Sequence, residues 1–247
     1  NGFGGLAYKF NDFNTIDFKL IYNHSASKNT TFLVGEDGEN IIAPSYKLGR
    51  AQLWQERQMI NYQVAGEHHL PKLGDLEIAW RGSIVNADRT EPNLRFFSSQ
   101  YDAETGTEGI PLANVNDPYY FWRNLNDDIK VGAIDFTLPI LKQKNDGSKI
   151  KVGGFLSNKE RNFDEYRYII ATPQYATDYT GDIDAFFADD NTGLLRVDKL
   201  SGGRSRYVIG NYINEATRVE NSYAGYENVS AAYAMFTISP LRKLKLI

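Results

Sequence analysis

Residues 76–84 read Leu-Glu-Ile-Ala-Trp-Arg-Gly-Ser-Ile, and this short stretch decides the fold class. Its residues alternate in character, so that Ile78 and Trp80 fall on one side of an extended chain while Glu77 and Arg81 fall on the other. A period of two residues is typical of a β-strand with one apolar face, whereas a helix repeats every 3.6 residues. The stretch therefore predicts a strand.

The same alternation recurs along the chain and outlines about eight strands, while helical periodicity is weak throughout. Each strand has one mostly apolar face and one mostly polar face. The predicted fold class is therefore all-β, with antiparallel strands. The expected strands cover residues 4–10, 14–27, 48–69, 75–87, 127–140, 148–163, 222–238 and 243–247.

The connections between these strands alternate between short and long. Among the short ones are Asn11-Asp12-Phe13 and Lys144-Asn145-Asp146-Gly147, whose Asn, Asp and Gly residues suit a tight turn. The long ones cover 28–47, 88–126 and 164–221. This order predicts a sheet with all its long loops at one end.

The composition excludes several classes of function. Lys and Arg number 27 against 31 Asp and Glu, a net charge of −4, which gives no basic footprint for nucleic acid. No apolar run approaches the roughly 18 residues of a membrane helix. The absence of Cys removes disulfides, Cys-ligated zinc and a Cys nucleophile. Because no phosphate loop or nucleophile–histidine signature is recognisable, we expect no enzymatic activity and no cofactor.

Loop asymmetry separates the two architectures that alternating strands allow. Nothing in a soluble β-sandwich forces the long loops to one end. Outer-membrane barrels combine short periplasmic turns with long extracellular loops, and their strands carry apolar residues towards lipid and polar ones towards the lumen. We therefore favour an antiparallel transmembrane β-barrel. The aromatic residues expected on its lipid face are Tyr22, Trp54, Tyr62, Trp80, Phe136 and Tyr233.

Several stretches resemble the barrel strands of TonB-dependent outer-membrane receptors, the ligand-gated transporters of Gram-negative bacteria, and of the Bacteroidetes-type receptors in particular. The resemblance covers nearly the whole chain but involves no short diagnostic motif. It is strongest from Trp54-Gln55-Glu56-Arg57 to residues 86–92 (Asn-Ala-Asp-Arg-Thr-Glu-Pro), and it recurs in residues 152–161 (Val-Gly-Gly-Phe-Leu-Ser-Asn-Lys-Glu-Arg), 227–236 and 243–246.

The resemblance implies a section of a barrel of about 22 strands with a plugged lumen, in the outer membrane of a Gram-negative bacterium. Such receptors capture scarce nutrients and import them with energy from the TonB complex. A plug, a TonB-contacting segment and a terminal aromatic residue are not recognisable, so we expect residues 1–247 to form part of one transmembrane β-barrel domain without its plug. The implied partners are the lipid bilayer, the remaining strands and plug, the TonB complex and an extracellular nutrient ligand.

The candidate ligand-binding residues form an aromatic run within the expected loop 88–126. Tyr119, Tyr120, Phe121 and Trp122 could stack on a sugar or another flat ligand. Packing of the loop against its neighbours is the alternative role for the same residues.

The polar strand faces carry charges that would line a barrel lumen and pair with each other or with the plug. In a soluble sheet the same residues would form the hydrated face, and their spacing selects no substrate. The charges expected to face the lumen are Arg57, Arg81, Asp135, Lys151 and Arg161, together with Asp17, Lys19, Glu67 and Lys159.

Metal binding has little support in the sequence. His68 and His69 are adjacent on a strand and point to opposite faces, so that a single ion is hard to bind with both. The acidic segment from Asp182 to Asp190 carries the oxygen ligands that Ca²⁺ takes but lacks EF-hand spacing. We expect a solvated surface loop there and no metal site.

Three functions remain open. The leading hypothesis is a portion of a TonB-dependent receptor that imports a nutrient. The second is a soluble all-β module that binds a ligand such as a carbohydrate on Tyr119 to Trp122. The third is a complete eight-stranded outer-membrane barrel, whose interior would be filled by side chains and would leave no transport path.

Overall fold

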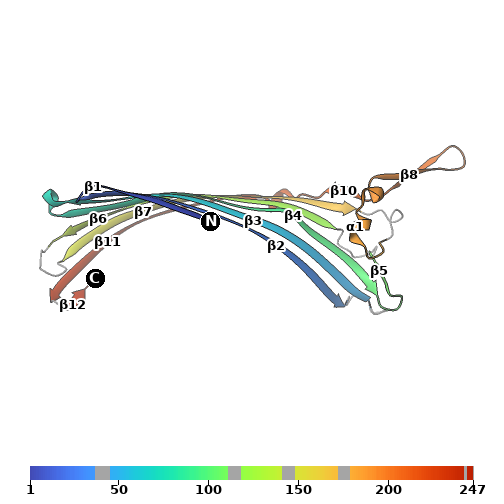
Figure 1. Ribbon diagram of the computed structural model, residues 1–247, viewed down its shortest axis with the longest axis horizontal. Coiled ribbons are helices and arrows are strands. Elements are labelled where there is room, and N and C mark those ends of the chain that lie inside the picture. Colours follow the sequence, from blue (N-terminus) through green and yellow to red (C-terminus); the bar gives the residue numbers. More distant parts are fainter. Residues whose placement is uncertain (37–44, 111–117, 141–147, 172–178, 242–243, 247) are drawn as a thin grey trace.

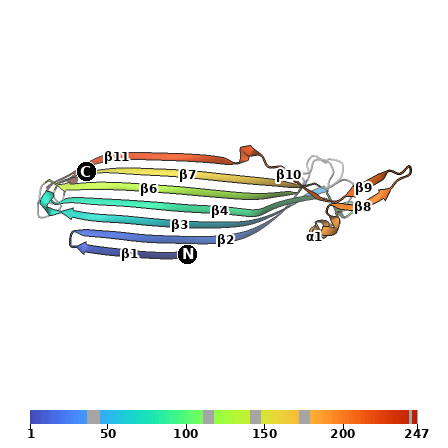
Figure 2. The ribbon, with the colours of Figure 1, turned by 90° about the horizontal axis from the view of Figure 1, so that it is seen from above.

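The computed structural model describes residues 1–36, 45–110, 118–140, 148–171, 179–241 and 244–246. Long antiparallel strands lie side by side in one curved sheet (Figures 1 and 2), which confirms the predicted all-β class. Along the sheet the order is β1 (Gly2–Asn11), β2 (Asn14–Glu36), β3 (Ser45–Leu70), β4 (Leu76–Asp102), β6 (Tyr119–Pro139), β7 (Lys149–Ala171), β11 (Tyr223–Leu241) and β12 (Leu244–Leu246).

Two of the expected short turns are formed by local hydrogen bonds and backbone geometry. Between β1 and β2, the Asn11 side-chain oxygen accepts hydrogen bonds from the Phe13 amide at 2.9 Å and from Asn14 Nδ2 at 2.8 Å. Between β3 and β4, a 3-10 turn (Pro71–Leu73) is followed by Gly74 in the left-handed region. The predicted turn at 144–147 lies outside the described residues.

The strands continue well into the segments that were predicted to be long loops. β2 extends to Glu36, β4 to Asp102 and β7 to Ala171. The apolar alternation fades in these extensions, but the backbone ladder does not: β2 and β3 stay in uninterrupted register from Asn14–His68 to Glu36–Tyr46. The prediction failed because it followed side-chain pattern, whereas neighbouring strands satisfy the backbone groups regardless of pattern.

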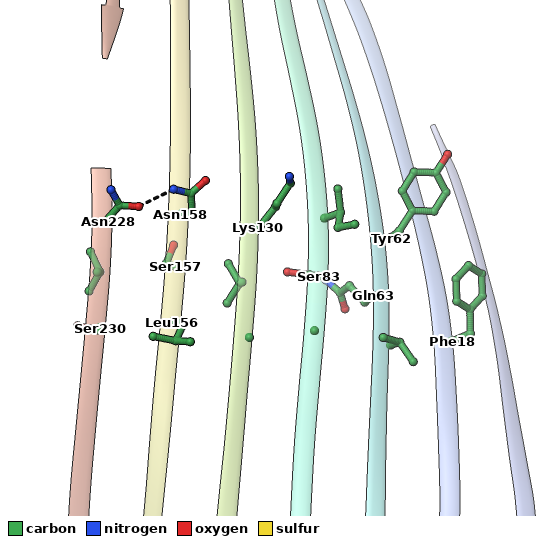
Figure 3. Close-up of a pocket in the computed structure, with 16 residues that line it drawn as sticks. Phe18, Tyr62, Gln63, Ser83, Lys130, Leu156, Ser157, Asn158, Asn228 and Ser230 are labelled. Atoms are coloured by element: carbon green, nitrogen blue, oxygen red, sulfur yellow. Dashed lines mark hydrogen bonds between the residues drawn. The ribbon is translucent and has the colours of Figure 1, made fainter. Parts of the chain in front are cut away.

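The register gives the sheet two chemically different faces. On the apolar face, Phe18, Val64 and Leu156 lie in one cross-strand row that passes over Gly82 and Gly132. These glycines floor a shallow hollow of about 700 Å³, and Figure 3 shows Phe18 and Leu156 beside it. The polar face carries the residues between these positions.

All the charges expected to face the lumen lie on the polar face, since they occupy the opposite set of strand positions. The paired positions that define this set include Asp17–Ala65–Arg81, Lys19–Gln63, Ser25–Arg57, Glu67–Ala79–Asp135, Thr137–Lys151, Ile129–Lys159 and Asp127–Arg161.

Five of the six predicted lipid-face aromatic residues lie on the apolar face, and Tyr233 does not. Tyr233 pairs with Gly153 on the polar face, where its hydroxyl donates to Asp135 Oδ1 at 2.7 Å. The lipid-face assignment of Tyr233 was therefore wrong. The alternation in β11 is ambiguous because apolar residues near Tyr233 occur on both faces of the strand, as the consecutive Ala231 and Ala232 show.

The segment after β7, predicted to be a loop, forms a small structured cap at the end of the sheet away from the turns. From Tyr179 it contains α1 (Ile183–Phe186), a 3-10 turn (Asp189–Asn191), the hairpin β8 (Leu194–Lys199)–β9 (Ser205–Ile209), β10 (Tyr212–Glu215) and a second 3-10 turn (Val219–Asn221). Phe186 is 2% exposed and packs with Phe97 of β4 and with Tyr179. β10 pairs with β7, and β5 (Thr107–Gly109) pairs with β4.

None of the helices within the described ranges is both long and apolar enough to cross a membrane.

Candidate ligand-binding surface on the polar face

The part of the polar face nearest the turns holds two of the predicted charges as an ion pair. Lys151 Nζ lies 3.4 Å from Asp135 Oδ2, and the lysine also sits 5.8 Å from the centre of the Tyr233 ring. Beside this pair, Arg81 lines a hollow of about 340 Å³ together with Asp17 and Lys19. Its lining is mixed, because Val64, Ala65 and Val131 stand beside the charged side chains.

The middle of the polar face is built around a paired carboxylate. Asp127, only 8% exposed, accepts hydrogen bonds from Arg161 Nε at 2.7 Å and Nη2 at 2.6 Å. Lys159 Nζ lies 3.7 Å from the same carboxylate. Such bidentate geometry fixes both side chains. Arg57 and Arg89 line a hollow of about 320 Å³ beside Asp127.

Further from the turns, two nearly buried glutamates bridge four strands. Glu91 and Glu165 are each 7% exposed. Arg123 Nε donates to Glu165 Oε2 at 2.6 Å and its Nη1 lies 3.8 Å from Glu91 Oε2, while Gln55 Nε2 donates to Glu91 Oε1 at 2.5 Å. Buried charges require such partners, because unpaired ones are costly. The network therefore keeps this part of the face rigid.

The aromatic run predicted to be a loop platform is instead the beginning of β6, and strand alternation divides it. Tyr119 and Phe121 are on the polar face, whereas Tyr120 and Trp122 are on the apolar face. The four residues cannot form one platform, which corrects the prediction. The cause is the same as for the other strand ends: residues 119–126 lack the apolar alternation that marks a strand in sequence.

The polar-face half of the run combines with two arginines that the sequence did not single out. The Arg167 guanidinium lies 4.1 Å from the Tyr119 ring centre, and that of Arg123 lies 4.6 Å from the Phe121 ring centre. Arg167 Nε is buried and has no hydrogen-bond partner among the described residues. This group of two aromatic rings and two guanidinium groups can stack on a flat ligand and donate hydrogen bonds to it. The signal that could have revealed it is the odd-position series Tyr119, Phe121 and Arg123.

The two adjacent histidines point to opposite faces, as predicted. On the apolar face, His68 Nδ1 is 2.8 Å from Asn14 Oδ1, and Trp80 Nε1 donates to His68 Nε2 at 3.0 Å. On the polar face, His69 stacks on Phe13 and lies 3.4 Å from Asp75 Oδ1. Both rings thus serve local structure.

The acidic segment from Asp182 to Asp190 begins with a helix cap. Asp182 Oδ1 accepts hydrogen bonds from the amides of Asp184 and Ala185 at the start of α1. Within the part of the chain that the structure describes, no three His, Cys, Asp or Glu residues are grouped as metal ligands would be.

Comparison with known proteins leaves the chain without an assigned family: no protein-family model matches the sequence, and no curated protein matches it significantly.

Proposed function

We propose that this chain is a section of the wall of an outer-membrane TonB-dependent receptor that imports a scarce nutrient. The observation that carries the proposal is the apolar face, whose large side chains are exposed across the sheet. Leu6 is 72% exposed, Leu156 65% and Ile84 49%. Exposed apolar surface on this scale calls for an apolar covering, and a lipid bilayer supplies one along the whole band.

The dimensions of the apolar band match a bilayer. On β3 the apolar face carries Ile60, Tyr62, Val64 and Leu70, and the next position outward is Gln58. Ten steps of ~3.4 Å from Ile60 to Leu70 give roughly 34 Å along the strand. With a tilt of ~40°, such a strand rises about 26 Å, close to the ~25 Å apolar band of outer-membrane barrels.

The outer boundary of the band also slopes as tilted strands require. On β7 the apolar band ends at Leu156, which lies in the same cross-strand row as Val64 of β3. On β3 the band ends at Ile60, which lies four residues further outward than Val64 (64 − 60 = 4). Four residues are about 14 Å, and three strand spacings of ~4.8 Å are also about 14 Å. The boundary thus slopes at about 45° to the rows, comparable to the ~35–45° strand tilt of such barrels.

The polar face supports the transport part of the proposal. In a barrel wall it would face the lumen, with paired charges such as Asp127–Arg161 lining the passage and the ring–guanidinium group of Tyr119, Phe121, Arg123 and Arg167 near its outer end. Ligand capture is assigned to that group, since it combines flat apolar rings with two guanidinium groups.

The test is a matched pair of arginine substitutions at neighbouring positions, Val64→Arg on the apolar face and Gln63→Arg on the polar face, both in the full-length gene product. Val64 lies inside the apolar band of β3, between Ile60 and Leu70, and arginine near the middle of a lipid-facing band costs about 2–4 kcal/mol. We expect Val64→Arg to reduce the amount of receptor assembled in the outer membrane at least tenfold, and Gln63→Arg to leave it within twofold.

Val64 is 38% exposed, so an arginine there would reach solvent and be tolerated in a protein surrounded by water. Equal assembly of the two variants, or a chain that stays monodisperse without detergent, would contradict the membrane assignment.

A further inference from the structure

The hollow over Gly82 and Gly132 exists because two neighbouring strands lack side chains in the same cross-strand row. Val64 and Leu156 stand on either side of these glycines in that row. A methyl group added to Gly132 would meet nothing within 4 Å, so no described side chain fills the space above it. The volume of about 700 Å³ is therefore open to a molecule from outside the chain.

The walls of this hollow change from apolar to polar between β3 and β11. On β3 and β4 they include Tyr62 and Ile84, which are 44% and 49% exposed. In the same row, β6, β7 and β11 contribute Lys130, Asn158 and Asn228, and Figure 3 shows Lys130 beside Asn158. A molecule that fills the hollow must therefore be apolar at one end and polar at the other.

The change in the walls coincides with the outer boundary of the apolar band. Because that boundary slopes across the rows, it passes beyond Tyr62 on β3 but lies at Leu156 on β7, next to Asn158. The apolar end of the hollow thus lies inside the proposed band, and its polar end lies at the level of lipid headgroups. A lipid is the molecule that has this arrangement of apolar and polar parts.

The polar end of the hollow offers donors to an anionic group. Lys130 is exposed and forms no ion pair with a described residue. Asn158 Nδ2 donates to Asn228 Oδ1, which leaves Asn228 Nδ2 as a second donor beside the lysine row. An ammonium group and an amide that point out of a sheet can together bind a phosphate.

An acidic pair lies one row further out, about 7 Å along the strands. Asp128 of β6 and Glu160 of β7 are directly opposite each other, and both are on the apolar-face side of their strands. Like charges in this position destabilise a sheet unless a cation lies near them. Their hydrogen-bond donors among the described residues are the neutral amides of Asn86 and Asn162. The pair therefore favours a cation from outside the chain.

We infer that the hollow binds a membrane lipid whose headgroup is a phosphate followed by a primary amine, as in phosphatidylethanolamine. An acyl chain lies over Gly132, the phosphate accepts from Lys130 and Asn228, and the ammonium group donates to Asp128 and Glu160. The order of charges fits, because the phosphate of such a lipid is nearer to the acyl chains than the amine is. A headgroup with a phosphate and no amine would leave the acidic pair without a cation, and a quaternary amine has no hydrogen to donate.

The inference rests on the proposed function, since only a membrane brings lipid to this face, but the two can fail separately. The test therefore compares lipids that share their acyl chains. The full-length gene product in detergent is titrated with dioleoyl phosphatidylethanolamine, phosphatidylglycerol and phosphatidylcholine, and native mass spectrometry measures the dissociation constant of the first lipid bound.

Two variants change the site, and each has a matched control. Gly132→Leu fills the floor of the hollow, whereas Gly4→Leu adds the same side chain to the same face, at a position that also has nothing within 4 Å and does not line the hollow. Asp128→Asn/Glu160→Gln removes the acidic pair, whereas Asp164→Asn removes an exposed carboxylate from the same face of β7, further from the hollow.

We expect wild type to bind phosphatidylethanolamine about fivefold more tightly than either other lipid, as one charge near a membrane surface can provide. Gly132→Leu should weaken that binding at least threefold, and Gly4→Leu should change it less than twofold. Asp128→Asn/Glu160→Gln should bind phosphatidylethanolamine and phosphatidylglycerol within twofold of each other, and Asp164→Asn should keep the preference of wild type.

Equal binding of the three lipids by wild type would overturn the inference and leave the membrane assignment standing. Binding of none of them would overturn the inference and would also count against the membrane assignment. The inference would fail as well if Gly4→Leu weakened binding as much as Gly132→Leu, or if the preference for phosphatidylethanolamine survived removal of the acidic pair.

Discussion

Single residues on the apolar face show how closely its side chains pack. A methyl group added to Gly66 would lie 2.5 Å from the indole of Trp80, which is held in place by its hydrogen bond to His68. At Gly132, in a neighbouring row of the same face, an added methyl group would meet nothing within 4 Å. The two glycines therefore differ in the space around them, although both lie within a paired strand.

Gly66→Ala should destabilise the folded sheet, whereas Gly132→Ala should not. Overpacking costs about 1–3 kcal/mol, and alanine otherwise suits a strand better than glycine by ~0.5–1 kcal/mol. Guanidinium unfolding in detergent micelles measures the difference. Equal free energies of unfolding for the two variants would refute the packing of Trp80 over Gly66.

The cap contains a group whose ionisation depends on the fold. Burial, reinforced by the negative charge of Glu108, raises the pKa of Tyr179 to about 12. The pKa of an unfolded tyrosine is about 10, so the folded protein retains this proton more strongly. The resulting stabilisation is complete below pH ~10 and is lost as the pH rises towards 12.

Tyr179→Phe should remove this pH dependence. The measurement is the denaturation midpoint of each protein at pH ~9 and at pH ~11. Between these two pH values the wild type should lose more stability than the variant. Parallel losses in the two proteins would show that Tyr179 is not the responsible group.

At the scale of elements, the cap is attached to the sheet by one small cluster of buried hydrophobic side chains and by the short pairing of β10 with β7, and it should open independently of the long strands. The cluster consists of Phe97 of β4 and of Tyr179 and Phe186 of the cap. The long strands, in contrast, share long ladders on both sides, with register shifts only between Gln52 and Glu56 on β3 and between Pro92 and Leu94 on β4.

Phe186→Ala should cost about 3–5 kcal/mol locally and release the cap while the sheet stays folded. Hydrogen exchange checks this: the Asn211 amide, bonded to the Asn191 carbonyl at 2.7 Å, should lose protection, and amides of β4 from Leu76 to Ile84 should keep theirs. Val219→Ala, at a side chain 86% exposed, is the control. Simultaneous loss of protection in β4 would show that cap and sheet are one cooperative unit.

The elements also show what sequence reasoning can and cannot reach. Leu76 to Ile84 is a strand with the predicted faces, because one of its faces is uniformly apolar and so selects a register. Residues 119–126 were missed because both of their faces mix aromatic and polar groups, and only pairing with β4 and β7 makes them a strand. The hollow of about 650 Å³ between the cap and the sheet, which Tyr120 and Asn211 line, could not be predicted, because only tertiary packing brings these two residues together.

At the scale of the whole molecule, one continuous apolar surface supports the proposed place of the chain in a membrane. The height of the apolar band and the slope of its outer boundary are those expected when tilted strands cross a bilayer. The polar face holds charges in pairs such as Asp135–Lys151. In the proposed receptor, the two faces would separate the lipid from a polar passage.

Depth-resolved quenching by brominated lipids tests this most directly, because all three tryptophans lie on the apolar face. Trp80 is inside the proposed band, and Trp54 lies six residues beyond Ile60 on β3 (60 − 54 = 6), outside it. Two double variants, Trp54→Phe/Trp122→Phe and Trp80→Phe/Trp122→Phe, each leave one of these two. In vesicles whose acyl chains are brominated near the bilayer centre, we predict strong quenching of Trp80 and little of Trp54. A folded protein in which Trp80 is quenched no more than Trp54 would contradict the account.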